Sequence, residues 1–181
     1  LAGFYRGWLD GLLMRFTDIL LSIPQILLLI SAAALFKASI QTTVIVIGLT
    51  SWRGAARIVR GQFLALRNQE YVTAARSIGA TPVQIVWRHL LPNALAIIIV
   101  EATLWLSLAI LLEASLSYLG LGVQIPEPSW GNMLQDGQRD LINGAWWMTV
   151  FPGLAIFVAV LSFNLMGDGL RDAFDPRLRR R

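Results

Sequence analysis

The sequence has no cysteine and little charge. Charged residues make up 14% of its 181 positions, whereas hydrophobic residues reach 56%; an average soluble domain carries about 25% charged residues. Without cysteine there are no disulfide bonds, no thiolate metal ligands and no cysteine nucleophile. A chain this apolar is also not intrinsically disordered, because disorder requires low hydrophobicity. The composition therefore predicts an integral membrane protein.

Lysine and histidine are almost absent, which removes several kinds of site. The only lysine is Lys37 and the only histidine is His89. Lys37 follows Phe36 and lies in no phosphate-binding G-x-x-x-x-G-K-[ST] loop, and neither H-E-x-x-H nor G-x-S-x-G occurs. We therefore expect no catalytic residues, no metal site, no cofactor and no ATPase activity of the chain's own. The basic residues stand in blocks between apolar runs, which favours membrane topology over nucleic-acid binding.

Four charge-poor runs predict membrane-spanning helices. They are residues 19–36, 38–52, 89–112 and 141–167, and only Glu101 interrupts them. Pro24 lies near the start of the first run, where a membrane helix can tolerate a proline. The second run is short, so its helix is expected to continue past Arg53. Trp146 and Trp147 suit the membrane interface at the start of the fourth.

The basic residues set the orientation of these spans. Thirteen of the fifteen lie in residues 1–15, 53–88 and 171–181, which alternate with the predicted spans. Because such residues concentrate on the cytoplasmic side, both termini and segment 53–88 are predicted to be cytoplasmic. The 114–140 loop is then external.

The cytoplasmic segment 70–93 has the pattern of a helix, a turn and a second helix. Small and apolar residues recur at helical spacing, and Gly79 is suited to end the first helix. These residues are Tyr71, Ala74, Ala75 and Ile78. Thr81, Pro82 and Gln84 then form the start of the next helix, with a capping box. From the residues alone, the first helix either lies on the bilayer surface or docks in the groove of a partner protein.

This segment resembles the EAA loop of binding-protein-dependent ABC transporter permeases. TAARSIG followed by HLLPN matches the pattern at Ala74, Ala75, Gly79, Leu91 and Pro92, whereas Thr73 stands where the pattern has glutamate. In that family the loop carries a coupling helix that sits in a cleft of the ATPase subunit. The resemblance thus implies a coupling loop at residues 67–93, whose candidate contact residues are Glu70, Tyr71, Ala74, Ala75, Ile78, Gly79, Leu91 and Pro92.

The resemblance covers the whole chain and narrows the group. GFYRGWLDGLLMRFTDILLSIPQ, ILLEASLSYLGLGVQIPEPSWGNML and FPGLAIFVAVLSFNLMGDGLRDAFDPRL are similar to dipeptide, oligopeptide and nickel permeases. This similarity implies an all-α, polytopic transmembrane helical bundle in the bacterial inner membrane. Such permeases usually have six spans, so residues 1–181 are expected to be one transmembrane domain that lacks two N-terminal spans. The implied partners are a second permease subunit, ATP-binding subunits, an external substrate-binding protein and membrane lipid, with no nucleic acid.

Several residues keep two interpretations at this stage. Arg53, Arg57, Arg60 and Arg67 share a helix face, where interfacial anchoring is favoured over substrate binding. Glu101 and Glu113 are candidate pathway-lining residues, because an acid within a membrane is costly; Glu113 could instead lie at the outer interface or pair with another subunit. Residues 126–138 predict a short external helix that either meets the binding protein or packs at the interface.

The substrate stays open between dipeptides, longer peptides, nickel chelates and glutathione. An ATP-driven peptide importer is the favoured function, working by alternating access. An autonomous channel and an intramembrane enzyme are the alternatives from other classes. Neither gives the cytoplasmic helix pair a role.

Overall fold

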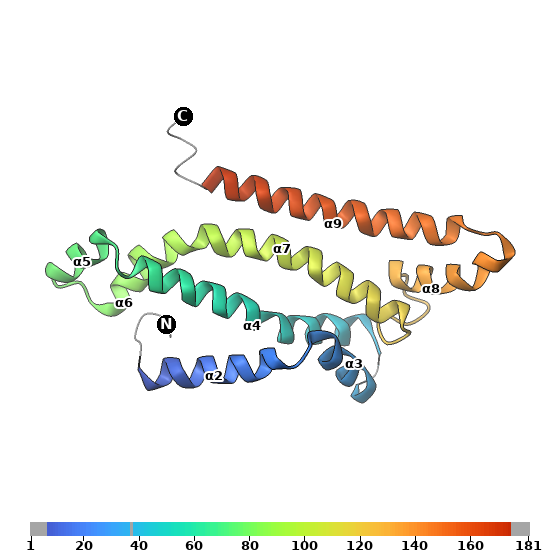
Figure 1. Cartoon of the computed structure of the whole chain (residues 1–181), viewed down its shortest axis with the longest axis horizontal. Helices are drawn as coiled ribbons and strands as arrows, with labels where there is room; N and C mark the ends of the chain where they lie inside the picture. Colours follow the sequence, from blue (N-terminus) through green and yellow to red (C-terminus); the bar gives the residue numbers. More distant parts are fainter. Residues whose placement is uncertain (1–6, 37, 175–181) are drawn as a thin grey trace. The chain divides into compact units, whose positions relative to one another are not determined.

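The computed structural model describes residues 7–36 and 38–174, and within these ranges all regular secondary structure is helical (Figure 1). A π-helical turn at Val86–Leu90 joins α6 to α7, and a 3₁₀ turn at Leu141–Asn143 follows α8. The α-helices are α2 (Trp8–Ser22), α3 (Gln25–Leu35), α4 (Ile40–Leu66), α5 (Glu70–Ser77), α6 (Pro82–Ile85), α7 (Leu91–Tyr118), α8 (Trp130–Asp140) and α9 (Trp147–Phe174).

The chain divides into two compact units. The described part of the first unit comprises residues 7–22, 52–102 and 168–174. Its core lies where α5, α6 and the π turn pack against α4 and the start of α7. The buried members of this core, called here the loop core, are Phe63, Val72, Ala75, Ile85, Val86, Leu90 and Ala94.

The described part of the second unit comprises residues 23–36, 38–51 and 103–167. Leu29, Ile47 and Leu116 form its buried apolar cluster and bring together α3, α4 and α7. The Ser107 hydroxyl donates a hydrogen bond of 3.3 Å to the Val160 carbonyl, which ties α7 to α9. Close packing of helices by small side chains and cross-helix hydrogen bonds is typical of membrane proteins.

Two described helical segments are long and apolar enough to cross a membrane. They are Pro82–Tyr118, which runs through α6, the π turn and α7, and Trp147–Phe174, which is α9. The bent pair Asp10–Ser22 and Gln25–Leu35 makes a third candidate if it forms one span. α4 continues past Arg53 as predicted, and at 27 residues it is long enough to span. Its apolar half alone is shorter than a bilayer requires, so a span in α4 stays a prediction.

The structure corrects the expected course of residues 19–36. They do not form one helix: α2 ends at Ser22 and α3 begins at Gln25. Pro24 is the N-cap of α3, with φ −54° and ψ 131°. Proline has no N–H and disfavours helical geometry in the preceding residue, Ile23. The helix is therefore interrupted at Pro24, although the sequence analysis expected a membrane helix to tolerate this proline.

A second proline is accommodated differently. Pro92 follows the π turn, and the Leu91 N–H donates to the Val86 carbonyl five residues back. In an α-helix the ring of Pro92 would clash with the Arg88 carbonyl, which would also lack its usual donor. The wider π turn relieves this conflict, so helix continues from Pro82 to Tyr118.

Candidate functional site

Helix α5 is held by its own chain along one side. Val72 is fully buried and Ala75 is 6% exposed, and both belong to the loop core. Their partners come from α4 (Phe63) and from the segment after the turn (Ile85 and Val86). Figure 1 shows α5 and α6 beyond the end of α4, next to the first turns of α7. An eight-residue helix is marginal in isolation, so this packing is what keeps α5 helical.

The turn after α5 has the geometry that the sequence predicted. Gly79 has φ +85°, and its N–H donates to the Arg76 carbonyl at 3.0 Å. The Ala80 N–H donates to the Ala75 carbonyl at 3.0 Å. These two bonds make a Schellman motif, and the left-handed residue at its centre favours glycine.

The start of α6 is also confirmed. The Thr81 side chain accepts a hydrogen bond from the Gln84 N–H at 3.3 Å, and the Gln84 side chain accepts one from the Thr81 N–H at 2.9 Å. Pro82 occupies the first helical turn. This reciprocal capping box fixes where the chain re-enters helix, so both ends of the turn are defined.

The outer side of α5 is apolar and exposed. Tyr71 is 38% exposed and Ile78 is 86% exposed, with the exposed Ala74 between them. The Tyr71 ring lies 6.3 Å from that of His89 on the π turn. Partial burial of the Tyr71 phenol raises its pKa above the ordinary value. This exposed set, Tyr71, Ala74 and Ile78, is called the α5 face below.

The structure corrects the predicted helix face at one residue. The spacing placed Ala75 with Tyr71, Ala74 and Ile78 on a surface for a partner, but Ala75 faces the loop core. The remaining loop candidates differ in their exposure. Glu70 and Pro92 are exposed, and Leu91 packs against the loop core.

Arg53 and Arg60 on α4 contact the protein instead of anchoring at the interface. Arg53 is 3% exposed and donates a hydrogen bond to the Leu20 carbonyl of α2. Arg60 makes a two-pronged ion pair with Asp10, at 2.7 and 2.6 Å. This ion pair raises the pKa of Arg60. Arg57 is exposed, as interfacial anchoring requires. Asp10 is a structural residue that the sequence analysis missed.

The two candidate pathway acids have different surroundings. Glu101 belongs to the first unit and Glu113 to the second, and both are half-buried on α7. The Ser117 hydroxyl donates to the Glu113 carboxylate at 2.7 Å. Glu113 also lines a groove of about 450 Å³. Glu113 therefore combines a carboxylate with a space for a ligand.

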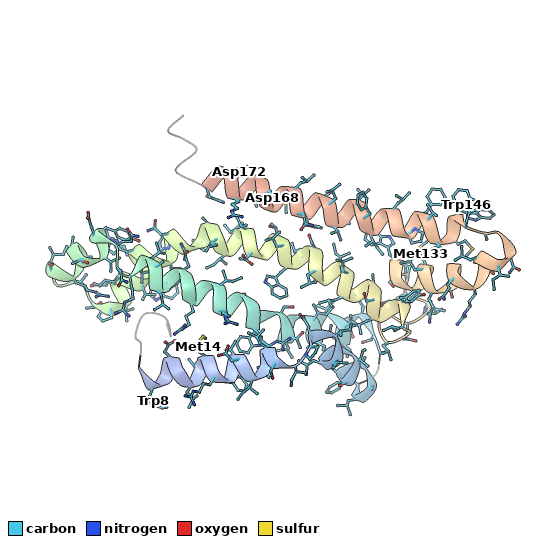
Figure 2. The ribbon with its side chains drawn as sticks, in the orientation of Figure 1. Trp8, Met14, Met133, Trp146, Asp168 and Asp172 are labelled. Atoms are coloured by element: carbon cyan, nitrogen blue, oxygen red, sulfur yellow. The ribbon has the colours of Figure 1, made fainter. Side chains whose placement is uncertain are left out.

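The 114–140 loop contains the predicted helix, shifted toward the C-terminus. α8 runs from Trp130 to Asp140, with Ser129 as its N-cap. Its Gln138 accepts a hydrogen bond of 2.7 Å from the Tyr118 hydroxyl of α7. Figure 2 shows Met133 on α8 and Trp146 next to the start of α9. Trp146 and Trp147 are 57% and 49% exposed, which agrees with an interfacial position.

Helices that are long and apolar enough to span a membrane are a feature of a transport permease. The chain belongs to the family of binding-protein-dependent transport system inner membrane components, which matches residues 1–180. It is a multi-pass inner membrane component.

Curated relatives of this chain include proteins named as dipeptide or glutathione transport permeases. The dipeptide transport system permease protein DppC of Bacillus subtilis is 42% identical over 179 residues, covering 99% of this chain and 56% of that protein. The DppC of Alkalihalophilus pseudofirmus is 45% identical, covering 99% and 59%. The glutathione transport system permease protein GsiD of Pectobacterium atrosepticum is 44% identical, with the same coverage. The chain thus spans less than two thirds of the length of these relatives.

Proposed function

We propose that this chain is part of a permease subunit of an ATP-driven importer of short peptides. Two permease subunits would form the membrane pathway, two ATP-binding subunits would bind on the cytoplasmic side, and an external protein would deliver the substrate. Family membership and the names of the relatives support this assignment. The chain's own contribution would be to line part of the pathway and to receive the movement of the ATPase.

The observation that carries the coupling role is the division of α5 into a braced side and an exposed side. Val72 and Ala75 are locked into the loop core, whereas the α5 face is open. An apolar helix face of this kind fits a groove on a partner protein. Because the other side is packed against α4 and α7, a push on α5 would move those helices with it. A helix lying loosely on lipid would not need this bracing.

The grouping of segments supports the proposed sidedness. The three segments predicted to be cytoplasmic, in their described parts, fall in the first unit, and the 114–140 loop falls in the second. Arg57 and Arg76 are exposed in the first unit, where the positive-inside rule expects basic residues.

Two substrate classes are supported by named relatives. Dipeptides come first, since both DppC proteins are dipeptide permeases, and glutathione is the second candidate through GsiD. Competition separates them: unlabelled dipeptide should inhibit uptake of a labelled dipeptide at lower concentration than glutathione does. Stronger competition by glutathione would reverse the order. Uptake of nickel chelates but of neither peptide would overturn both.

The coupling role predicts that bulk on the α5 face blocks docking. Ala74→Arg adds a long charged side chain to this face without entering the loop core, and a charge desolvated against an ATPase cleft is costly. We expect normal abundance in the membrane, with at least tenfold less co-purified ATPase and a matching loss of uptake, since about 1.4 kcal/mol corresponds to tenfold.

Thr73→Arg is the matched control. Thr73 is exposed on the same helix, about 100° around the axis from Ala74, so the same charge is added off the α5 face. Ala75→Arg is unsuitable, because Ala75 is buried in the chain's own core. Full uptake by the Ala74→Arg variant, or equal losses in both variants, would remove the α5 face as the docking surface.

A further inference from the structure

A groove in the second unit holds a carboxylate in largely apolar surroundings, with Ser129 as its other polar lining residue. Its volume is about 450 Å³, which is in the range of small-ligand sites. Its apolar walls come from α4, from the connection after α7 and from α8, and are formed by Ile40, Val44, Val123, Pro128, Trp130 and Met133. Glu113 is the acidic residue of the lining.

A hydrogen bond from Ser117 fixes the position of the Glu113 carboxylate. Ser117 is fully buried and uses its one hydroxyl proton to donate to Glu113 Oε1 at 2.7 Å. The same hydroxyl oxygen accepts a hydrogen bond from the Val123 N–H at 3.0 Å. The hydroxyl proton of Ser117 is thereby committed to Glu113 and its orientation is set by the backbone, so it holds one oxygen of Glu113 in place. The second carboxylate oxygen is left for another partner.

No cation pairs with Glu113 in residues 7–36 and 38–174. A carboxylate that lines a groove with largely apolar walls attracts a positive charge placed in that groove. Trp130 adds an aromatic ring to the same groove, and aromatic rings also attract cations. A carboxylate ligand would be repelled by Glu113. The lining of the groove therefore favours a ligand that carries a positive charge next to an apolar group.

We propose that this groove binds the N-terminal ammonium group of a peptide substrate. Glu113 accepts hydrogen bonds from the ammonium group, and the apolar walls take the first side chain. This inference rests on the proposed function, because it makes the groove a binding site on the import pathway. It also orients the substrate, with its amino end at Glu113 and its carboxylate directed away.

Cysteine trapping in the assembled, reconstituted transporter tests the proposal. Met133→Cys puts a thiol in the groove, and these 181 residues contain no other cysteine. The probes are the dipeptide Phe-Cys, with its thiol activated as a 2-thiopyridyl disulfide, and the same compound acetylated at its amino group. Thiolate attack releases pyridine-2-thione, which reports the rate. We expect the free amine to react about tenfold faster, because only the charged ammonium group is attracted to the Glu113 carboxylate; tenfold corresponds to about 1.4 kcal/mol.

Two further variants test whether Glu113 causes the preference for the free amine. Glu113→Gln, made in the Met133→Cys background, should abolish the preference for the free amine. Leu134→Cys is the control thiol, since Leu134 lines a different groove and should show no preference. Equal rates for the two probes at Met133→Cys, or a preference that survives Glu113→Gln, would overturn the proposal. ATP-driven peptide uptake by the unmodified transporter is measured in parallel, so failure of the peptide-importer assignment is recognised separately.

Discussion

At the scale of single residues, Arg53 compensates for a missing backbone donor. The Leu20 carbonyl would normally accept a bond from the N–H four residues later, but that residue is Pro24, which has none. Arg53 donates to this carbonyl instead. It also places positive charge at the C-terminal end of α2, where the helix dipole favours a cation. A buried arginine is thus explained by a proline elsewhere in the sequence.

This explanation predicts that Arg53 and Pro24 are coupled. Arg53→Met should lower the thermal unfolding midpoint, because a buried unpaired carbonyl costs about 1–3 kcal/mol. Pro24→Ala restores an N–H at the position that can serve Leu20, so Arg53→Met should cost less in that background. Unfolding midpoints of the four combinations, measured for the purified assembled transporter, give the coupling.

Arg57→Met is the control for that cycle, since Arg57 is an exposed arginine on the same helix. Its effect should be small and independent of residue 24. Additive effects of Arg53→Met and Pro24→Ala would contradict the explanation.

Local residue chemistry could be predicted from the sequence, and distant pairing could not. Gly79, Thr81 and Gln84 act through neighbours within a few residues, so residue type and spacing sufficed to predict the helix end at Gly79 and the capping box. Arg53 and Arg60 instead find partners 33 and 50 residues away. Helical spacing showed that they share a face but not that α2 lies against it.

At the scale of secondary structure, α8 is fixed in the second unit by two close backbone approaches. A Cβ on Gly131 would overlap the Ala114 carbonyl and lie 2.6 Å from Ser117 Cβ on α7. A Cβ on Gly137 would lie 2.8 Å from the Met148 carbonyl oxygen on α9. α8 therefore lies against both spans, and it needs glycine at each contact.

Gly137→Ala should consequently displace α8. The clashing atoms include backbone that cannot move aside cheaply, and overpacking of this kind costs about 1–3 kcal/mol. We expect faster proteolysis or hydrogen exchange across Trp130–Asp140, read by mass spectrometry. Gly48→Ala is the control, because Gly48 lies in α4 with nothing within 4 Å of its added Cβ. That control should be neutral or stabilising, by up to about 1 kcal/mol. Unchanged exchange in α8 of the Gly137→Ala variant would refute the close-packed arrangement.

The α5 segment shows what helical periodicity can and cannot predict. The repeat of Tyr71, Ala74, Ala75 and Ile78 predicted the helix correctly, because that depends on spacing alone. It did not reveal which side is buried. Val72 and Ala75 turn inward because Phe63 and Ile85 are brought there by the turn, which is a tertiary effect. The candidate docking surface is consequently narrower than the pattern suggested.

At the scale of the whole molecule, sidedness is the property that unites topology and function. The positive-inside rule assigns residues 53–88 to the cytoplasm and 114–140 to the outside. The coupling proposal requires the first of these, and delivery of substrate by an external protein requires access to the second. If the α5 face were external, no ATPase could reach it, whatever its shape.

Single cysteines test this arrangement directly. Thr73→Cys lies on exposed α5, and Asp136→Cys lies on exposed α8, where the Asp136 side chain is 51% exposed. In right-side-out vesicles an impermeant thiol reagent should label Asp136→Cys and leave Thr73→Cys unlabelled, because an odd number of spans separates the two. Inverted vesicles should give the opposite pattern, and a permeant reagent should label both variants in either orientation. The second predicted span, in α4, does not lie between these residues, so the result bears on α7 alone. Labelling of both cysteines from the same side would mean that Pro82–Tyr118 does not cross the membrane. It would then remove the cytoplasmic coupling helix or the external α8, according to which side reacts.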